Sequence, residues 1–280
     1  MYKLLLVVVC VGVLCGAAFA IDQLDAYPQP PGLHWNYYPH FYTADKMKDH
    51  NGDTALDGIN MQLTEAMIRP VYIQKDWIFN AIVPVGEVKM TLPEVGTESS
   101  SGVGDIQIGV GKYQHMAGGN WTWLPHVMVK LANGPFEKDQ MVNYGSGQVS
   151  VALENYFIHC GHDWQLDGVV RYKLELKNHD TGVTPGDQFG AEVMISRGSK
   201  VPFLAWRKDL YGLAVEYMTS LKDKDDDGSI PDSQVTKLTI GPELYHGINP
   251  RCHFWMGVKW DVVSKNAPRG TLIWFKYTCF

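Results

Sequence analysis

Charged side chains recur at every second position along several apolar stretches of the chain. In residues 164–176, for example, Asp167, Arg171 and Lys173 alternate with large apolar residues. Ionisable groups on one face can pair with one another, line a water-filled passage or select a solute by its charge. The other stretches show the same alternation. If the stretches form a barrel, the residues that would line its lumen are His126, Lys130, Glu154, Asp167, Arg171, Lys173, Glu175, Glu192, Glu216, Lys237, Glu243, Lys259 and Asp261.

A second acidic cluster has the spacing of a calcium-binding loop. Asp223, Asp225 and Asp227 stand at alternate positions and a glycine follows them. Such a loop curls several oxygen ligands around one cation. However, Gln234 stands where a glutamate should close the site, and the flanking residues have the periodicity of strands. The segment is therefore either a weak calcium site or a solvated acidic loop, and no other cofactor is predicted.

The patterns that would indicate an enzyme are incomplete. The nearest nucleophiles and bases are Ser146 or Ser150 with His115 and His126, and none lies in the Gly-His-x-Ser-Asn context of outer-membrane phospholipases. Gly-x-Ser-x-Gly, His-Glu-x-x-His and glycine-rich phosphate loops are missing as well. Residues 159–162 read His-Cys-Gly-His, but two histidines without a second pair do not make a zinc site. The sequence therefore predicts a protein that is not an enzyme.

The alternation itself defines the elements that position these residues. In residues 252–263, Phe254 and Trp260 fall on one face, and Lys259 and Asp261 fall on the other. A period of two indicates a strand with one apolar and one polar face. These strands are longer than the roughly five or six residues typical of soluble sheets. Repeated about a dozen times, the pattern predicts an all-β fold, a transmembrane antiparallel up-and-down β-barrel of about 12 strands.

The links between the expected strands alternate in length. Links after the second, fourth, sixth and tenth strands are short, and those after the odd-numbered strands up to the ninth are longer and polar; residues 91–102 are one such loop. Outer-membrane barrels have short turns at the periplasmic rim and longer loops at the outer rim, so both termini are expected in the periplasm. The expected strands are residues 32–43, 58–72, 77–88, 103–115, 120–133, 146–159, 163–177, 187–197, 206–220, 234–246, 252–263 and 270–280.

The first twenty residues have the features of a secretory leader. A lysine precedes an apolar run, and small residues end it. We therefore expect a cleaved signal peptide at residues 1–20, export, and a mature chain that begins at Ile21. An anchor helix fits less well, because the run is near the lower length for a span. A lipoprotein is rejected, because Cys10 and Cys15 follow large residues.

Charge and cysteine content exclude two further classes. The formal net charge is −6 and becomes more negative when Lys3 leaves with the leader, so no nucleic-acid partner is predicted. Cys160, Cys252 and Cys279 remain in the mature chain. They are too few and too widely spaced for the disulfide framework of a small secreted domain. One bridge can form among them, and its pairing stays open.

The two ends of the mature chain differ from the rest. Prolines exclude a long strand in residues 21–31, which form either a periplasmic tail or a plug that enters the barrel domain at 32–280. The chain ends on Phe280, in phase with Leu272, as in terminal strands that the barrel-assembly machinery recognises, although Lys276 and Thr278 interrupt the apolar face. Candidates for the aromatic girdles at the membrane interfaces are Trp77, Trp121, Trp123, Trp164 and Trp274.

Four short segments, taken in order, are distinctive. They are Gly32-Leu-His-Trp-Asn-Tyr-Tyr38, Gly102-Val-Gly-Asp-Ile-Gln-Ile-Gly109, Ile240-Gly-Pro-Glu-Leu-Tyr245 and Pro268-Arg-Gly-Thr-Leu-Ile-Trp274. Together they resemble the outer-membrane family of transporters for the meta-pathway of phenol degradation. The resemblance extends from about residue 32 to the last residue and implies a barrel through which small, often apolar or aromatic compounds cross the outer membrane. It supplies neither a substrate nor transport residues.

These observations lead to one expected function and one alternative. We expect an outer-membrane channel for the passive passage of small solutes, with membrane lipid, the solute and the barrel-assembly machinery as partners. The interior of a twelve-stranded barrel lies between that of a filled eight-stranded barrel and that of an open porin. The alternative is therefore a structural or interaction barrel in which charged residues pair across a closed lumen.

Overall fold

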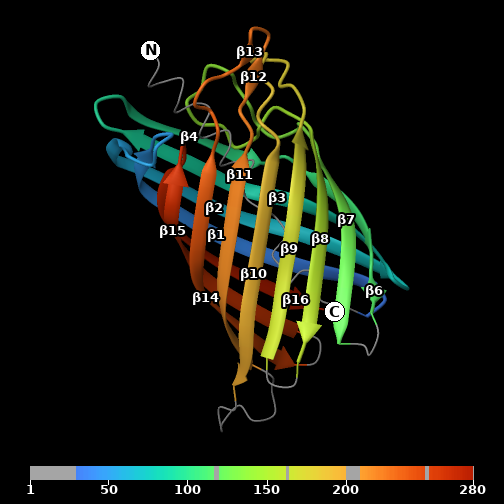
Figure 1. Ribbon diagram of the computed structural model, residues 1–280. Helices are drawn as coiled ribbons and strands as arrows, with labels where there is room; N and C mark the ends of the chain where they lie inside the picture. The colour runs from blue at the N-terminus through green and yellow to red at the C-terminus, as the bar shows by residue number, and fades with distance from the viewer. Residues whose placement is uncertain (1–29, 117–119, 162–163, 200–208, 250–251, 280) are drawn as a thin grey trace.

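The computed structural model describes residues 30–116, 120–161, 164–199, 209–249 and 252–279, which form an antiparallel β-barrel (Figure 1). No helix within these ranges is long and apolar enough to cross a membrane. Most of the expected signal peptide and tail, residues 1–29, lies outside the described residues. The strands are β1 (Gly32–Lys48), β2 (Thr54–Gln74), β3 (Trp77–Leu92), β4 (Gly96–Val103), β5 (Gln107–Lys112), β6 (Gln114–His115), β7 (Trp121–Lys130), β8 (Ser150–Cys160), β9 (Trp164–Glu175), β10 (Gln188–Ser199), β11 (Asp209–Ser220), β12 (Lys224–Asp225), β13 (Gly228–Ser229), β14 (Thr236–Asn249), β15 (Cys252–Lys265) and β16 (Pro268–Cys279).

The wall closes because β1 pairs with β2 on one side and with β16 on the other. The sheet contains 14 strands, and three of these, β4, β5 and β6, share one position between β3 and β7. Twelve strands therefore surround the lumen, as the alternation predicted. The short strands β12 and β13 form a separate hairpin outside the wall.

The two rims of the barrel differ in the segments that they carry. Trp35 near the start of β1 pairs with Cys279 at the end of β16, so both described ends lie at one rim, which we call the terminus rim. The opposite loop rim carries the β12–β13 hairpin, at the top of Figure 1. Residues 131–149, which follow β7, also begin at the loop rim. The three longest links, residues 131–149, 176–187 and 221–235, are at the loop rim, but sorting by length is incomplete. The links after β1, β3 and β15 at the same rim are short, and the link at residues 200–208 is at the terminus rim.

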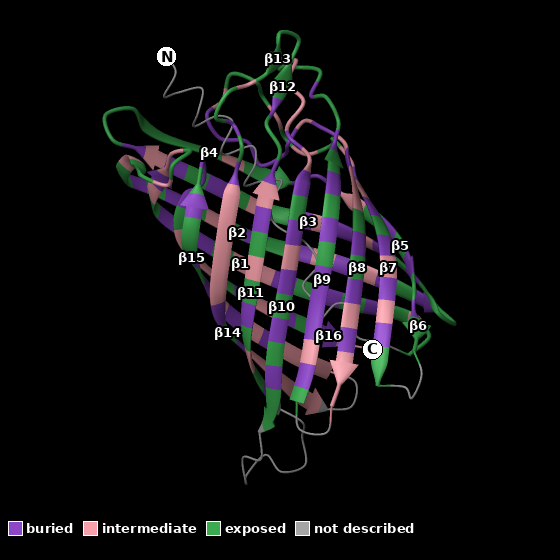
Figure 2. Cartoon of the chain, in the orientation of Figure 1, coloured by how far each residue is buried: buried purple, intermediate pink, exposed green. Residues whose placement is uncertain are grey.

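The outer face of the wall is apolar and the inner face contains most of the buried polar groups. On β9, Trp164, Tyr172 and Leu174 are exposed, whereas Asp167 and Arg171 between them are buried. Figure 2 shows this alternation as stripes along β9 and β10. An apolar exterior around a closed hydrogen-bonded wall is what a bilayer requires, because lipid cannot satisfy backbone polar groups.

Two expectations about the strands are wrong. Residues 91–102 do not form a long loop, since β4 pairs with residues 85–92 of β3. The side chains of β4 are mostly exposed beside the loop rim, where strand pairing needs no apolar face (Figure 2). The expected strand 103–115 is also interrupted, because residues 104–106 separate β4 from β5.

The expected phase of the last strand is wrong as well. Trp274 is buried on the inner face, whereas Ile273 and Tyr277 are exposed on the outer face. The indole of Trp274 lies against Gly257 of β15, where any side chain would collide with it. Trp274 is therefore no part of a girdle, and Lys276 belongs to the lumen rather than interrupting a lipid face.

A disulfide joins the outermost ends of β15 and β16. Cys252 and Cys279 are cross-strand partners at the terminus rim and are bonded to each other. Cys160 has its Sγ atom 3.9 Å from Gln165 Oε1. The structure thereby selects one pairing among the three that the sequence left open.

Candidate functional site

The candidate site is the inner face of the barrel, which has a charged wall and an apolar wall. All the ionisable residues expected in the lumen point inward, and all except Glu216 and Lys237 are buried. They come from β7, β8, β9, β10, β11, β14 and β15. Their part in the passage of a solute stays a prediction, but their contacts divide them into four groups.

The first group is centred on Glu154 of β8. His126 Nδ1 lies 2.9 Å from Glu154 Oε2, and Asn80 Nδ2 lies 3.0 Å from the other ring nitrogen of His126. With the Asn80 amide as donor, Nδ1 has the hydrogen that Glu154 accepts. Tyr156 also donates to Glu154, and Arg171 Nε lies 3.1 Å from its second oxygen. The carboxylate is thus satisfied from three strands.

The second group surrounds the ammonium of Lys259 on β15. Lys259 forms ion pairs with Glu192 of β10 and with Glu243 of β14, the latter at 3.3 Å. Glu216 of β11 lies 3.8 Å away. The ammonium also lies 5.8 Å from the centre of the Trp274 ring. One cation therefore links three carboxylates, which makes this the most acidic part of the charged wall.

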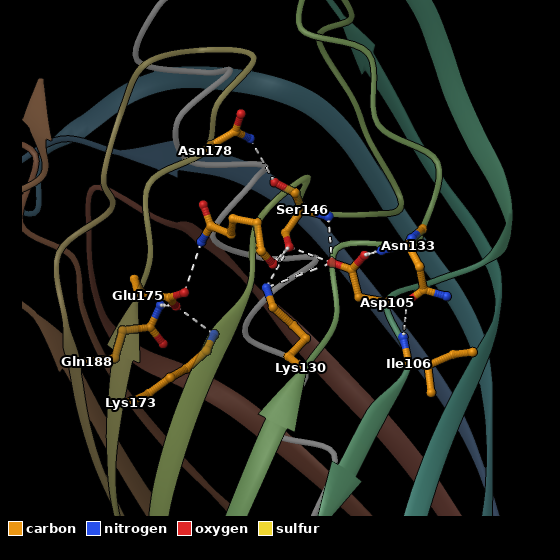
Figure 3. A network of polar contacts seen from close by, with 11 residues as sticks. Asp105, Ile106, Lys130, Asn133, Ser146, Lys173, Glu175, Asn178 and Gln188 are labelled. Atoms are coloured by element: carbon orange, nitrogen blue, oxygen red, sulfur yellow. Dashed lines mark hydrogen bonds and ion pairs between the residues drawn. The ribbon is translucent and has the colours of Figure 1, made fainter.

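The third group fastens the long segment after β7 inside the loop rim. Asp105, in the break between β4 and β5, accepts hydrogen bonds from the backbone N–H groups of Gly134 and Ser146, each at 2.8 Å. Lys130 Nζ donates to Ser146 Oγ at 2.5 Å (Figure 3). The Ser146 hydroxyl in turn donates to Asp105, so this serine joins the lysine to the carboxylate.

Glu175 of β9 extends this third group along the wall to the neighbouring strand β10. It accepts hydrogen bonds from Gln148 at 2.9 Å and from Gln188 at 3.1 Å, and Lys173 Nζ lies 2.7 Å from it (Figure 3). Residues 141–146 are all buried as a result. The segment therefore fills part of the lumen instead of projecting from the rim.

The fourth group consists of the two remaining acidic candidates, Asp261 and Asp167, each of which has its own hydrogen-bond donor. Asp261 lies 3.1 Å from Lys237 Nζ and accepts a hydrogen bond of 2.8 Å from the hydroxyl of Tyr42. Asp167 accepts from Gln165, whose Nε2 lies 2.9 Å from both carboxylate oxygens. Each buried carboxylate of the charged wall thus has a neighbouring donor, as burial of charge requires.

The opposite wall, formed mainly by β1, β2 and β3, is mostly apolar, although Glu65 and Arg69 of β2 are buried on it. Near the terminus rim Tyr38, Val71 and Ile78 belong to one buried cluster, which continues onto β7 and β8. Near the loop rim a second cluster includes Val88 and Leu92. Methionine is prominent on the inner face as a whole: the buried members are Met47, Met61, Met67, Met90, Met128, Met141, Met194 and Met218.

Comparison with known proteins places this barrel in a family. The family model described as "Putative MetA-pathway of phenol degradation" matches residues 44–277. The chain belongs to this family. The resemblance noted in the sequence is thereby confirmed. No curated protein matches the chain.

Solved structures with the same fold are distant in sequence. The "COG4313 outer membrane channel" of Pseudomonas putida F1 is 16% identical and superposes with a TM-score of 0.80 over 92% of this chain and 99% of that one. The translocator domain of the autotransporter NalP from Neisseria meningitidis is 9% identical, with a TM-score of 0.54 over 98% of this chain and 99% of that one. At such identities the likeness is one of fold, that of outer-membrane β-barrels.

Several inner residues of this family member escaped the sequence analysis. The charged ones are Glu65 and Arg69 on β2, Asp105 and Lys276, and all four are buried. Glu65 accepts a hydrogen bond of 2.8 Å from Tyr144 of the inserted segment. Lys276 could have been recognised as an inner residue because it is two positions from Trp274 and therefore on the same face of β16. Because Trp274 was assigned to the outer face, Lys276 was missed.

The acidic loop at residues 223–234 shows a different arrangement from a calcium loop. Asp223 is buried and accepts a hydrogen bond of 2.8 Å from Gly186 N, and Asp225 accepts one of 3.0 Å from Asp227 N. Burial raises the pKa of the Asp223 carboxyl above its ordinary value. The described residues contain no group of three histidine, cysteine or acidic side chains placed to hold a metal ion. Calcium binding by Asp223, Asp225 and Asp227 stays an untested prediction.

Proposed function

We propose that this member of the phenol-degradation family is an outer-membrane channel for the passive passage of small apolar or aromatic compounds. The observation that carries the proposal is the apolar inner wall. The interior of a porin for hydrophilic solutes is polar and filled with water. Here two buried apolar clusters lie along β1, β2 and β3, one near the terminus rim and one near the loop rim, with Glu65 of β2 between them.

The composition of this wall suits a moving apolar solute. Transfer of apolar surface out of water is favourable by about 25 cal/mol per Å². Met67 and Met128 lie in one cluster and Met61 and Met90 in the other, so similar surface is offered at successive depths. Methionine side chains are flexible and polarisable, and they adapt to guests of different shape. A solute could therefore pass from one cluster to the next without a single deep binding site.

The charged wall would have a complementary part. Each of its carboxylates has a neighbouring hydrogen-bond donor. The buried charges are therefore compensated, and this wall presents a polar surface to the lumen. A polar wall opposite an apolar one would orient amphiphilic compounds such as phenols, with the ring against β1–β3 and the hydroxyl toward the groups around Glu154 and Lys259. The assignment of the predicted lumen residues to solute passage is part of this proposal, as are a leader at residues 1–20 and passage without catalysis.

One observation favours the alternative of a closed barrel. The segment at residues 131–149 enters the lumen and is held there by Asp105 and Glu65. If this segment seals the loop rim permanently, the barrel is a structural or interaction protein. The channel and the closed barrel therefore differ in whether solutes cross the membrane through the protein.

Flux measurements with reconstituted protein test the proposal. Proteoliposomes should take up a fluorescent aromatic probe faster than empty vesicles, while swelling in sugar solutions stays slow. Met67→Gln combined with Met128→Gln should slow probe uptake, because both introduce polar groups into one apolar cluster. Met116→Gln is the matched control, since Met116 is exposed outside the wall. Probe uptake no faster than in empty vesicles would contradict the channel and favour the closed barrel.

A further inference from the structure

The outer face near the terminus rim has an alternating row of tryptophan and basic residues. The row follows six neighbouring positions of the wall, from β3 through β5, β7, β8 and β9 to β10, which are joined by strand pairing. We call it the Trp–basic arc. Its members, in order around the barrel, are Trp77, Lys112, Trp121, His159, Trp164 and Arg197.

Strand register makes each tryptophan of the arc the partner of a basic residue. Trp77 pairs with Lys112, and the lysine ammonium lies 5.6 Å from the centre of the indole ring. Trp164 pairs with Arg197. All four of these side chains are exposed. Cations and indole rings therefore meet side by side on the surface that faces the membrane.

A histidine stands at the middle of the arc between two indoles. His159 pairs with Trp121, and their ring centres are 4.4 Å apart. Its ring centre is 4.8 Å from that of Trp164. The Nδ1 atom of His159 is buried and has no hydrogen-bond partner among the described residues.

The arc covers only one side of the rim. On β16, β1 and β2 the outward aromatic residues have uncharged partners: Trp35 pairs with Pro70 and Cys279, and Tyr72 pairs with Leu33 and Phe79. Asp225 and Asp227 are exposed at the opposite, loop rim, whereas Asp76 is exposed beside Trp77 at the terminus rim. Among the described residues of the terminus rim, the outward pairs of a tryptophan with a basic residue thus lie on the β3–β10 side.

We propose that the Trp–basic arc binds the phosphate headgroups of anionic phospholipids in the leaflet at the terminus rim. Indole rings favour the depth of the headgroups in a bilayer. A lysine or arginine near an anionic leaflet gains attraction that a zwitterionic leaflet does not provide. Lys112 and Arg197 supply the charge, and the three tryptophans position the acyl chains against the wall. The arc spans four strand spacings between Lys112 and Arg197, so it holds a short row of lipids on one side of the barrel.

Native mass spectrometry of the full chain with defined lipids tests this binding. The protein should retain phosphatidylglycerol in preference to phosphatidylcholine. The double variant Lys112→Gln, Arg197→Gln should lower the affinity for phosphatidylglycerol about thirtyfold. The matched control is Lys89→Gln with Lys265→Gln, which removes two exposed lysines elsewhere on the wall and should leave the preference unchanged. Heat-modifiable migration on gels verifies that each variant is folded.

Three outcomes would overturn the proposal. Equal retention of the two lipids by the unaltered protein would show that the arc does not recognise charge. An equal loss in the control variant would show general attraction rather than a localised site. Displacement of phosphatidylglycerol by excess inorganic phosphate would assign the arc to free anions instead of lipid.

Discussion

The Asp105 carboxylate accepts hydrogen bonds from both the backbone N–H and the hydroxyl of Ser146, which lies at the far end of the segment that follows β7. Asp105 also accepts from Gly134 N near the start of the same segment. A single side chain in a strand break thus fastens both ends of residues 131–149 inside the lumen. Charge-assisted hydrogen bonds of this kind are among the stronger ones in proteins.

Asp105→Ala should release this segment. Loss of hydrogen bonds to a charged acceptor costs about 1.5–3 kcal/mol each, and Lys130 would lose its neighbouring carboxylate. We expect faster proteolysis within residues 131–149 and a higher conductance in planar bilayers. Asp226→Ala is the control, because the exposed ion pair of Asp226 with Lys177 is screened by solvent and contributes little to stability. Unchanged conductance and proteolysis in Asp105→Ala would contradict this role.

Lys259→Met should destabilise the barrel strongly. The substitution leaves Glu192, Glu216 and Glu243 close together without their shared cation. Breaking a buried ion pair in this way costs about 3–5 kcal/mol. Urea unfolding from lipid vesicles measures the loss, and Lys265→Met, exposed on the same strand, is the matched control. Adding Glu243→Gln to Lys259→Met should recover part of the loss; no recovery would show that the carboxylates are not coupled through the lysine.

The charged wall could be predicted from sequence because one face of its strands is polar. On β9 and β15 the residues between Asp167 and Arg171, or between Lys259 and Asp261, are apolar or small, so the phase is unambiguous. A slip of one residue would place these charges in lipid. The strand count followed from the same periodicity.

The apolar wall could not be predicted in this way. On β2 the inward residues Met67 and Val71 alternate with the outward residues Ile68 and Tyr72, so apolar side chains occur on both faces. Only Glu65 and Arg69 mark the inner face of this stretch, and two charges among so many apolar residues give a weak phase. The role of Asp105 depends on a strand break and on contacts with residues about forty positions later, which local patterns do not contain. Trp274 was misplaced for a related reason: its inward position depends on Gly257 of the neighbouring strand.

Loss of the Cys252–Cys279 disulfide should weaken the closure of the barrel. The bridge joins residues 27 apart and fastens the end of β16, the strand that pairs with β1. A loop of this size gives a stabilisation of about 2–4 kcal/mol. Cys279→Ser should therefore lower the temperature at which the barrel loses its compact migration on gels, and reductant should do the same to the unaltered protein. Cys160→Ser should have little effect; equal effects of the two variants would contradict the assignment.

Asp223 should make stability fall as the pH rises from acid toward neutral. Its pKa in the folded protein is raised above 3.8, chiefly by burial and also by the nearby Glu175, although Gly186 N–H opposes the shift. The folded state therefore binds the proton more tightly than the unfolded state does, and the stability present at low pH is lost as the pH passes from 3.8 through the raised pKa. Asp223→Asn keeps an acceptor for Gly186 and removes the charge, so it should be more stable than the unaltered protein at neutral pH. The difference in melting temperature between the two should shrink in acid; a constant difference across the pH range would mean that the Asp223 carboxyl is not the titrating group.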